Sequence, residues 1–92
     1  MIQSYKSKRL KVAAEKGDYS KIDPRHHKAV RAVLTALDSA ALLTDFDLPG
    51  KTLHQLKQFS PVRWSLDVSA NFRITFEWDK GHVYNVDYED TH

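Results

Sequence analysis

The sequence contains no cysteine among its 92 residues. Without a thiol, the chain cannot form a disulfide framework, present a thiol nucleophile or hold zinc through thiolate ligands. A short chain without disulfides is typical of a reducing cytosol. We therefore expect a cytoplasmic protein, and we expect any chemistry to rely on histidine, carboxylate, lysine and arginine side chains without a cofactor or a metal ion.

Long apolar runs are also missing. The longest nearly apolar stretch, Ala40–Leu43, is far shorter than the roughly 20 residues that a membrane-spanning helix needs. The residues after Met1 contain no apolar segment that could serve as a signal peptide. We expect a soluble protein that makes no contact with a membrane.

The chain is short enough to form one domain, residues 1–92. At 10.6 kDa it has one small core and no room for a second lobe, and a domain of this size buries roughly 60–65% of its unfolded surface. Repeats, linkers and low-complexity segments are absent from the sequence. Any functional site must therefore lie on the surface of that single core.

Charge is distributed unevenly along the chain. Residues 1–31 carry nine basic and three acidic side chains, a local charge of +6, whereas residues 32–92 carry five basic and nine acidic ones, a local charge of −4. A basic helical surface attracts polyanions through phosphate contacts and counterion release. A solvated helix face gives the same pattern, so charge alone leaves both interpretations open.

The first half of the chain has helical patterns. Ile2–Tyr5 alternates and predicts an edge strand, and residues 6–16 predict a basic helix that ends before Gly17. Asp23 followed by Pro24 is a preferred helix start. Apolar residues then recur at helical spacing, which predicts a second helix from Pro24 to about Ala40.

In the second half of the chain, apolar and polar residues alternate with a period of two residues. A turn is predicted at residues 47–50, after which apolar and polar residues alternate from Trp64 to Val68 and from Phe72 to Trp78. Asp79–Gly81 predicts a hairpin turn, followed by a strand at Val83–Tyr88. The expected fold is α+β, with an N-terminal edge strand and two helices packed on a twisted antiparallel sheet.

Five side chains could carry chemistry: His54, Lys57, Arg73, Asp90 and His92. Each has an ordinary structural alternative when taken alone. A histidine beside leucines is more often structural, an arginine on a strand can be a plain surface residue, and a C-terminus is disordered by default. Taken together, the five suffice for metal-free RNA cleavage, because attack by a ribose 2′-hydroxyl needs a base, an acid and cations for the phosphorane. Histidine can act as acid or base near neutral pH.

The adjacent pair His26 and His27 falls in the first turns of the predicted second helix. Neighbouring helical side chains point about 100° apart, so the two rings cannot easily share one metal ion. We expect both histidines to lie at the surface.

The sequence resembles HigB-type toxins of the RelE/ParE superfamily along its whole length. These toxins open with a segment like Met-Ile-x-Ser-Phe-Lys, carry a Leu-x-x-Leu-Lys segment, contain an aromatic-rich hairpin and end in Asp-Tyr-His. The similar segments here are Met1–Lys6, Leu53–Lys57, Trp64–Val68, Phe72–Phe76, Asp79–Gly81 and Tyr88–His92. No single segment identifies the family, but the order and spacing of all the segments together are specific for it.

The resemblance implies a RelE-like fold and metal-independent cleavage of mRNA in the decoding site of the bacterial 70S ribosome. On that analogy His54 and His92 are the acid and base, Asp90 orients or assists, and Lys57 and Arg73 stabilise the phosphorane. Ribosomal RNA would be held by the basic helices, through Lys6, Lys8, Arg9, Lys11, Lys28 and Arg31. The family also implies a HigA-type antitoxin with a helix-turn-helix domain, which alone would contact operator DNA.

Two positions depart from the family pattern. Thr91 replaces the tyrosine of Asp-Tyr-His and cannot stack on a base, and Asp67 puts a negative charge near the expected phosphate path. Two alternatives to a nuclease follow. One is a toxin of the same fold that acts on DNA gyrase, and the other is a degenerate toxin that serves only as a co-repressor with its antitoxin.

Overall fold

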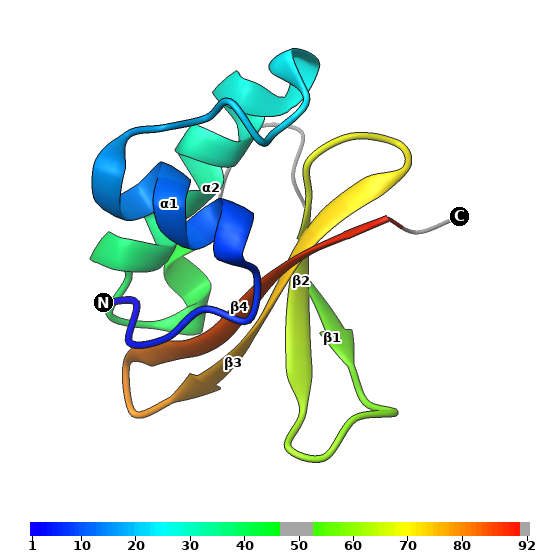
Figure 1. Cartoon of the computed structure of the whole chain (residues 1–92). Helices are drawn as coiled ribbons and strands as arrows, with labels where there is room; N and C mark the ends of the chain where they lie inside the picture. The colour runs from blue at the N-terminus through cyan, green and yellow to red at the C-terminus, as the bar shows by residue number, and fades with distance from the viewer. Residues whose placement is uncertain (47–52, 91–92) are drawn as a thin grey trace.

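The computed structural model describes residues 1–46 and 53–90. Its elements in this part of the chain are α1 (Lys8–Lys16), the 3-10 turn η1 (Pro24–His26), α2 (His27–Ser39), the 3-10 turn η2 (Leu43–Asp45), and the strands β1 (Leu53–Leu56), β2 (Arg63–Asp67), β3 (Phe72–Asp79) and β4 (His82–Asp90). The strands form one antiparallel sheet in the order β1-β2-β3-β4, with both helices on one side of it (Figure 1). The predicted α+β class is confirmed. The turn predicted at residues 47–50 lies outside the described residues.

Helix α1 begins two residues later than the sequence predicts. The Ser7 side chain accepts a hydrogen bond from the Leu10 backbone N–H, at 3.3 Å, and so caps the helix. The backbone N–H groups of Lys6 and Ser7 donate to the Val86 carbonyl of β4, at 2.8 and 3.1 Å. These bonds keep Lys6 out of the helix. The C-terminal end agrees with the prediction, because Gly17 adopts a left-handed conformation with φ of 68°.

The second predicted helix forms in two parts. Asp23 accepts a hydrogen bond from the Arg25 backbone N–H at 2.9 Å, and Pro24 occupies the first position of η1. The chain then continues as α2, which buries the predicted apolar stripe of Val30, Val33, Leu34 and Leu37. No described helix has the length and apolar character to cross a bilayer.

The N-terminal segment is paired with the sheet without forming the strand that the sequence predicts. Ile2 and Tyr5 make isolated parallel bridges to Val83 and Val86 of β4. Because only these two bridges form, the segment lies along the edge of β4 and leads directly into α1.

The two faces of the sheet differ in character. Leu66, Ile74 and Tyr88, which are paired across β2, β3 and β4, pack into the core beneath the helices. Neighbouring strand residues point to the opposite side, which we call the open face. It carries His54, Arg63, Ser65, Asp67, Arg73, Thr75, Glu77, Asp87 and Glu89. The open face therefore holds most of the polar side chains of the sheet.

Candidate functional site

Strand β1 places His54 on the open face. Its backbone pairs with Ser65 of β2, and its side chain, 52% exposed, points the Nε2 atom to within 3.8 Å of an Asp67 carboxylate oxygen. Lys57 follows directly after the last residue of β1, and it is exposed. Within the described part of the chain Lys57 makes no ion pair.

Arg73 lies on the same face, two strands away from His54. It pairs with Asp67 of β2 on one side and with Glu89 of β4 on the other. The Arg73 Nε atom is 3.4 Å from a Glu89 carboxylate oxygen, but it forms no hydrogen bond with any described residue, although it is buried. An N–H group that is buried without an acceptor is costly. The Arg73 side chain as a whole is 28% exposed, so an anion on the open face can approach its guanidinium group.

These pairings leave the open face without an excess of positive charge at this end of the sheet. Asp67 is close to His54, and Glu89 is close to Arg73. A phosphate that enters must compete with Glu89 for Arg73 and approach the negative charge of Asp67. The sequence prediction that Asp67 lies near the phosphate path stays a prediction, and the structure shows only that Asp67 is beside His54. The ion pair of Glu89 with Arg73 was not predicted.

Asp90 and His92 complete the set of five. Asp90 ends β4, pairs with Phe72 and is exposed. Because it alternates with Glu89, Asp90 lies on the Phe72 side of the strand and not on the open face with Arg73. His92, like Thr91, lies outside the described residues. The structure thus brings His54 and Arg73 onto one face, with Asp90 at the same end of the sheet.

A buried arginine that the sequence did not single out supports the open face. The Arg63 guanidinium donates to a Glu77 carboxylate at 2.9 Å, to the Thr75 hydroxyl at 2.9 Å and to the Asn85 backbone carbonyl at 2.8 Å. These partners belong to β3 and β4, so one side chain of β2 ties three strands together. Only 8% of Arg63 is exposed, which makes it part of the scaffold.

The predicted RNA-binding cations are all exposed. Three lie on α1, two on α2 and one just before α1: Lys8, Arg9 and Lys11, Lys28 and Arg31, and Lys6. Two of the arginines also rest on aromatic rings, Arg9 on Tyr88 and Arg31 on Tyr19, at 4.8 and 4.9 Å from the ring centroids. Such contacts hold the guanidinium groups in place while leaving donors for an anion.

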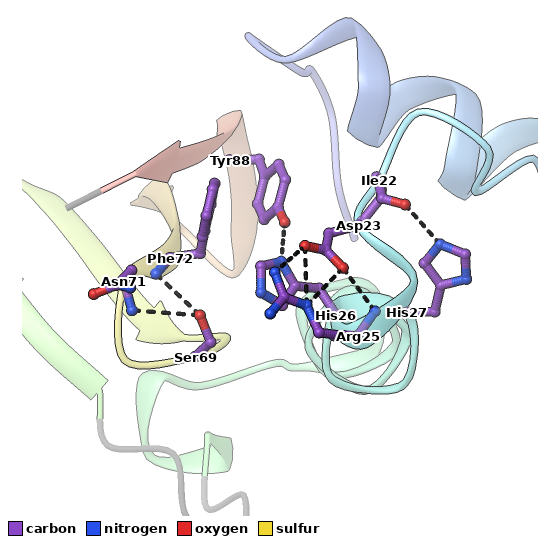
Figure 2. A network of polar contacts seen from close by, with 9 residues as sticks. All are labelled: Ile22, Asp23, Arg25, His26, His27, Ser69, Asn71, Phe72 and Tyr88. Atoms are coloured by element: carbon purple, nitrogen blue, oxygen red, sulfur yellow. Dashed lines mark hydrogen bonds and ion pairs between the residues drawn. The ribbon is translucent and has the colours of Figure 1, made fainter. Parts of the chain in front are cut away.

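The expected surface position is wrong for His26. His26 is buried with 6% of its surface exposed, and its Nδ1 atom shares a hydrogen bond with the Tyr88 hydroxyl of β4 (Figure 2). His27 is half-buried, and its Nε2 atom donates to the Ile22 carbonyl at 2.8 Å. The start of α2 packs against the sheet, and a sequence pattern does not reveal that contact.

Metal ligands do not gather in the described part of the chain. Residues 1–46 and 53–90 contain no group of three or more histidine and carboxylate side chains placed to hold one ion. The independence of cleavage from metal stays a prediction.

Comparison with known proteins relates nearly the whole chain to a toxin family and its full length to a curated relative. The family of the RelE-like toxin of the type II toxin–antitoxin system HigB matches residues 3–92. Endoribonuclease HigB of Proteus vulgaris is 37% identical over 92 residues, which cover 100% of this chain and 100% of that protein.

Proposed function

We propose that this chain, which belongs to the HigB-like family of RelE-like type II toxins, is an endoribonuclease that cleaves mRNA on the ribosome. The similarity to Endoribonuclease HigB covers both chains completely. The observation in the structure that supports the proposal most is the placement of His54 and Arg73 on one open face.

The proposed reaction is an in-line displacement at phosphorus. A base removes the proton of the ribose 2′-hydroxyl, the 2′-oxygen forms a bond to phosphorus, and the bond from phosphorus to the 5′-oxygen breaks. An acid gives its proton to the departing 5′-oxygen, so the products are a 2′,3′-cyclic phosphate and a 5′-hydroxyl. We assign the base and the acid to His54 and His92, without deciding which is which.

The remaining site residues are assigned to charge and orientation. Arg73 and Lys57 supply fixed positive charge to the phosphorane, which carries more negative charge than the ground state. Asp90 orients or assists from the end of β4. Because these groups are protein side chains, the reaction needs neither a cofactor nor a metal ion.

The charge balance of the open face supports a role for the ribosome. Glu89 already pairs with Arg73, and Asp67 places a second negative charge beside His54, so the face attracts free RNA weakly. A ribosome that holds the mRNA in place would supply the orientation that the isolated protein lacks. We therefore expect much weaker cleavage of free RNA than of mRNA in the 70S decoding site.

Replacing Lys8 with glutamate tests the role of the basic helices. The substitution should weaken binding to ribosomes and lower the slope of log affinity against log salt by about 0.7–0.9, because one phosphate contact is lost. Helix α1 should tolerate the change, since glutamate suits a first helical turn. Lys80→Glu, an equal charge change in the turn between β3 and β4, is the control. Equal losses in both variants would contradict a specific role of α1.

Replacing Asp67 with asparagine tests the charge balance. Removing the carboxylate 3.8 Å from His54 should raise single-turnover cleavage on ribosomes by up to about fivefold, because a contact between exposed charges is worth about 0.2–1 kcal/mol. The shape of the side chain is preserved. A fall in the rate would show instead that Asp67 orients His54 for the reaction.

The family implies an antitoxin as partner. We propose that this antitoxin is HigA-type, with a helix-turn-helix domain, and that the toxin reaches operator DNA only through it. Ribosomes and mRNA are the other proposed partners, which places the protein in the bacterial cytoplasm.

Expression in cells separates the proposal from its alternatives. Induction should stop growth and generate new mRNA 5′ ends at a fixed phase within codons, before plasmid supercoiling changes. An early change in supercoiling with intact mRNA would indicate gyrase as the target. Uncut mRNA with unchanged supercoiling would indicate a co-repressor, a function that the position of Asp67 beside His54 favours over gyrase poisoning.

A further inference from the structure

A buried polar contact joins the helical layer to the strand that ends in the proposed site. His26, at the end of η1, and Tyr88, on β4, share a hydrogen bond although they are 62 residues apart in sequence. Both are almost fully buried, with 6% and 5% of their surfaces exposed. Figure 2 shows the Tyr88 hydroxyl directed at the His26 ring. Asp90 follows two residues after Tyr88.

Aromatic packing holds both rings from the sides. Phe72 of β3 stacks on Tyr88 with a centroid distance of 5.1 Å and lies 4.8 Å from the His26 ring. Phe72 is also the strand partner of Asp90. The same aromatic side chain therefore touches the His26–Tyr88 pair while its backbone pairs with the last residue of β4.

The hydroxyl of Tyr88 keeps its proton in this environment. Burial raises the pKa of Tyr88, and the nearby Arg9 guanidinium only partly opposes this effect. A neutral phenol can donate to Nδ1 of a histidine that carries its proton on Nε2, and it can accept from Nδ1 in the other state. The hydrogen bond between Tyr88 and His26 can therefore form with either tautomer of the neutral imidazole ring.

His26 is itself fixed by the start of the helix. Its backbone N–H donates to the Asp23 carbonyl at 2.8 Å, and the Asp23 carboxylate caps η1 through the Arg25 backbone N–H at 2.9 Å. Asp23 also forms an ion pair with the Arg25 side chain at 2.7 Å (Figure 2). Because the backbone around His26 is anchored, the histidine can restrain Tyr88.

We propose that His26 and Tyr88 are positioning residues for RNA cleavage, which hold the end of β4 and thereby Glu89, the neighbour of Tyr88 that pairs with Arg73 on the open face. The inference rests on the proposed nuclease function. Neither residue touches the substrate. Their effect arises because a displacement of about 1 Å in a reacting group can cost about 10²-fold in rate.

Four variants test the proposal. Tyr88→Phe keeps the stacked ring and removes the hydroxyl, and His26→Leu keeps much of the volume and removes Nδ1. Both should lower kcat on mRNA-programmed ribosomes by about tenfold or more, with KM unchanged. His26→Asn, whose amide can occupy the place of Nδ1, should recover most of the rate. The control is His27→Leu, which loses a hydrogen bond to Ile22 away from β4 and should leave kcat unchanged.

An NMR measurement without RNA tests the positioning role of His26 and Tyr88 separately from the proposed nuclease function. In Tyr88→Phe and His26→Leu, the amide NMR signals of Glu89 and Asp90 should shift and their heteronuclear relaxation should indicate greater motion, while His27→Leu leaves them in place. Unmoved signals, or an equal loss of kcat in His27→Leu, would overturn the positioning role. A wild-type protein that cleaves no mRNA but shows the expected NMR changes would overturn only the nuclease function.

Discussion

His92→Ala should lower ribosome-dependent mRNA cleavage by about 10²–10⁴-fold, the usual contribution of a general acid or base. The expectation follows from the chemistry, since in-line attack needs two proton-transfer groups and His54 supplies only one on the open face. Single-turnover cleavage on programmed ribosomes measures the effect directly. Expression of the variant should no longer stop growth.

The control for His92→Ala is the stability of the domain. The core formed by the helices and sheet lies upstream of the substitution, so the midpoint of urea unfolding should match that of the wild type. Binding to ribosomes should also be unchanged, because the basic side chains of α1 and α2 are intact. A folded variant that remains equally toxic would exclude His92 from the reaction.

Arg63→Ala should lower the free energy of unfolding by up to about 3–5 kcal/mol, because it removes a buried guanidinium and leaves the partly buried Glu77 carboxylate without its cation. It also removes the hydrogen bonds to the Thr75 hydroxyl and the Asn85 carbonyl. A domain of 92 residues has only about 5–14 kcal/mol in total, so the loss is a large fraction of the stability. Equilibrium urea unfolding measures it.

Two comparisons give the Arg63 experiment its specificity. Arg25→Ala removes another ion-paired arginine, but one whose side chain is 84% exposed, and it should change stability little. The double replacement Arg63→Met with Glu77→Leu should recover much of the loss, since an apolar pair avoids the cost of burying charge. If the single Arg63 variant is as stable as Arg25→Ala, the network does not hold the three strands together.

The two helices and the last three strands were predictable because the spacing of apolar residues within each element reveals its type. The apolar stripe of α2 has helical spacing, and the residues of β3 alternate between core and open face. Strand β1 has no such pattern. Its apolar residues, Leu53 and Leu56, are three positions apart, which fits a helix as well as a strand. The strand exists because β2 pairs with it, and a nonlocal partner leaves no local signal.

The candidate site was predictable by residue type but not by arrangement. His54 and Arg73 stand out because cationic side chains alternate with apolar ones in the second half of the chain. Their ion-pair partners depend on strand register, and a shift by one residue would move Glu89 to the other face. The burial of His26 depends on its contact with Tyr88 of β4. The apolar periodicity of α2 describes one helix and cannot predict a contact with a distant strand. The ion pairs of the site and the burial of His26 therefore depend on contacts between residues far apart in the sequence, which local patterns do not predict.

Primer extension on a defined mRNA tests the proposed function most directly, with purified protein and with or without translating ribosomes. The expected result is a set of 5′ ends in codon phase that requires ribosomes and disappears when a 2′-deoxynucleotide replaces the ribose at the cut. Cleavage that persists at the 2′-deoxy position, or that proceeds equally well on free RNA, would contradict attack by the 2′-hydroxyl on the ribosome.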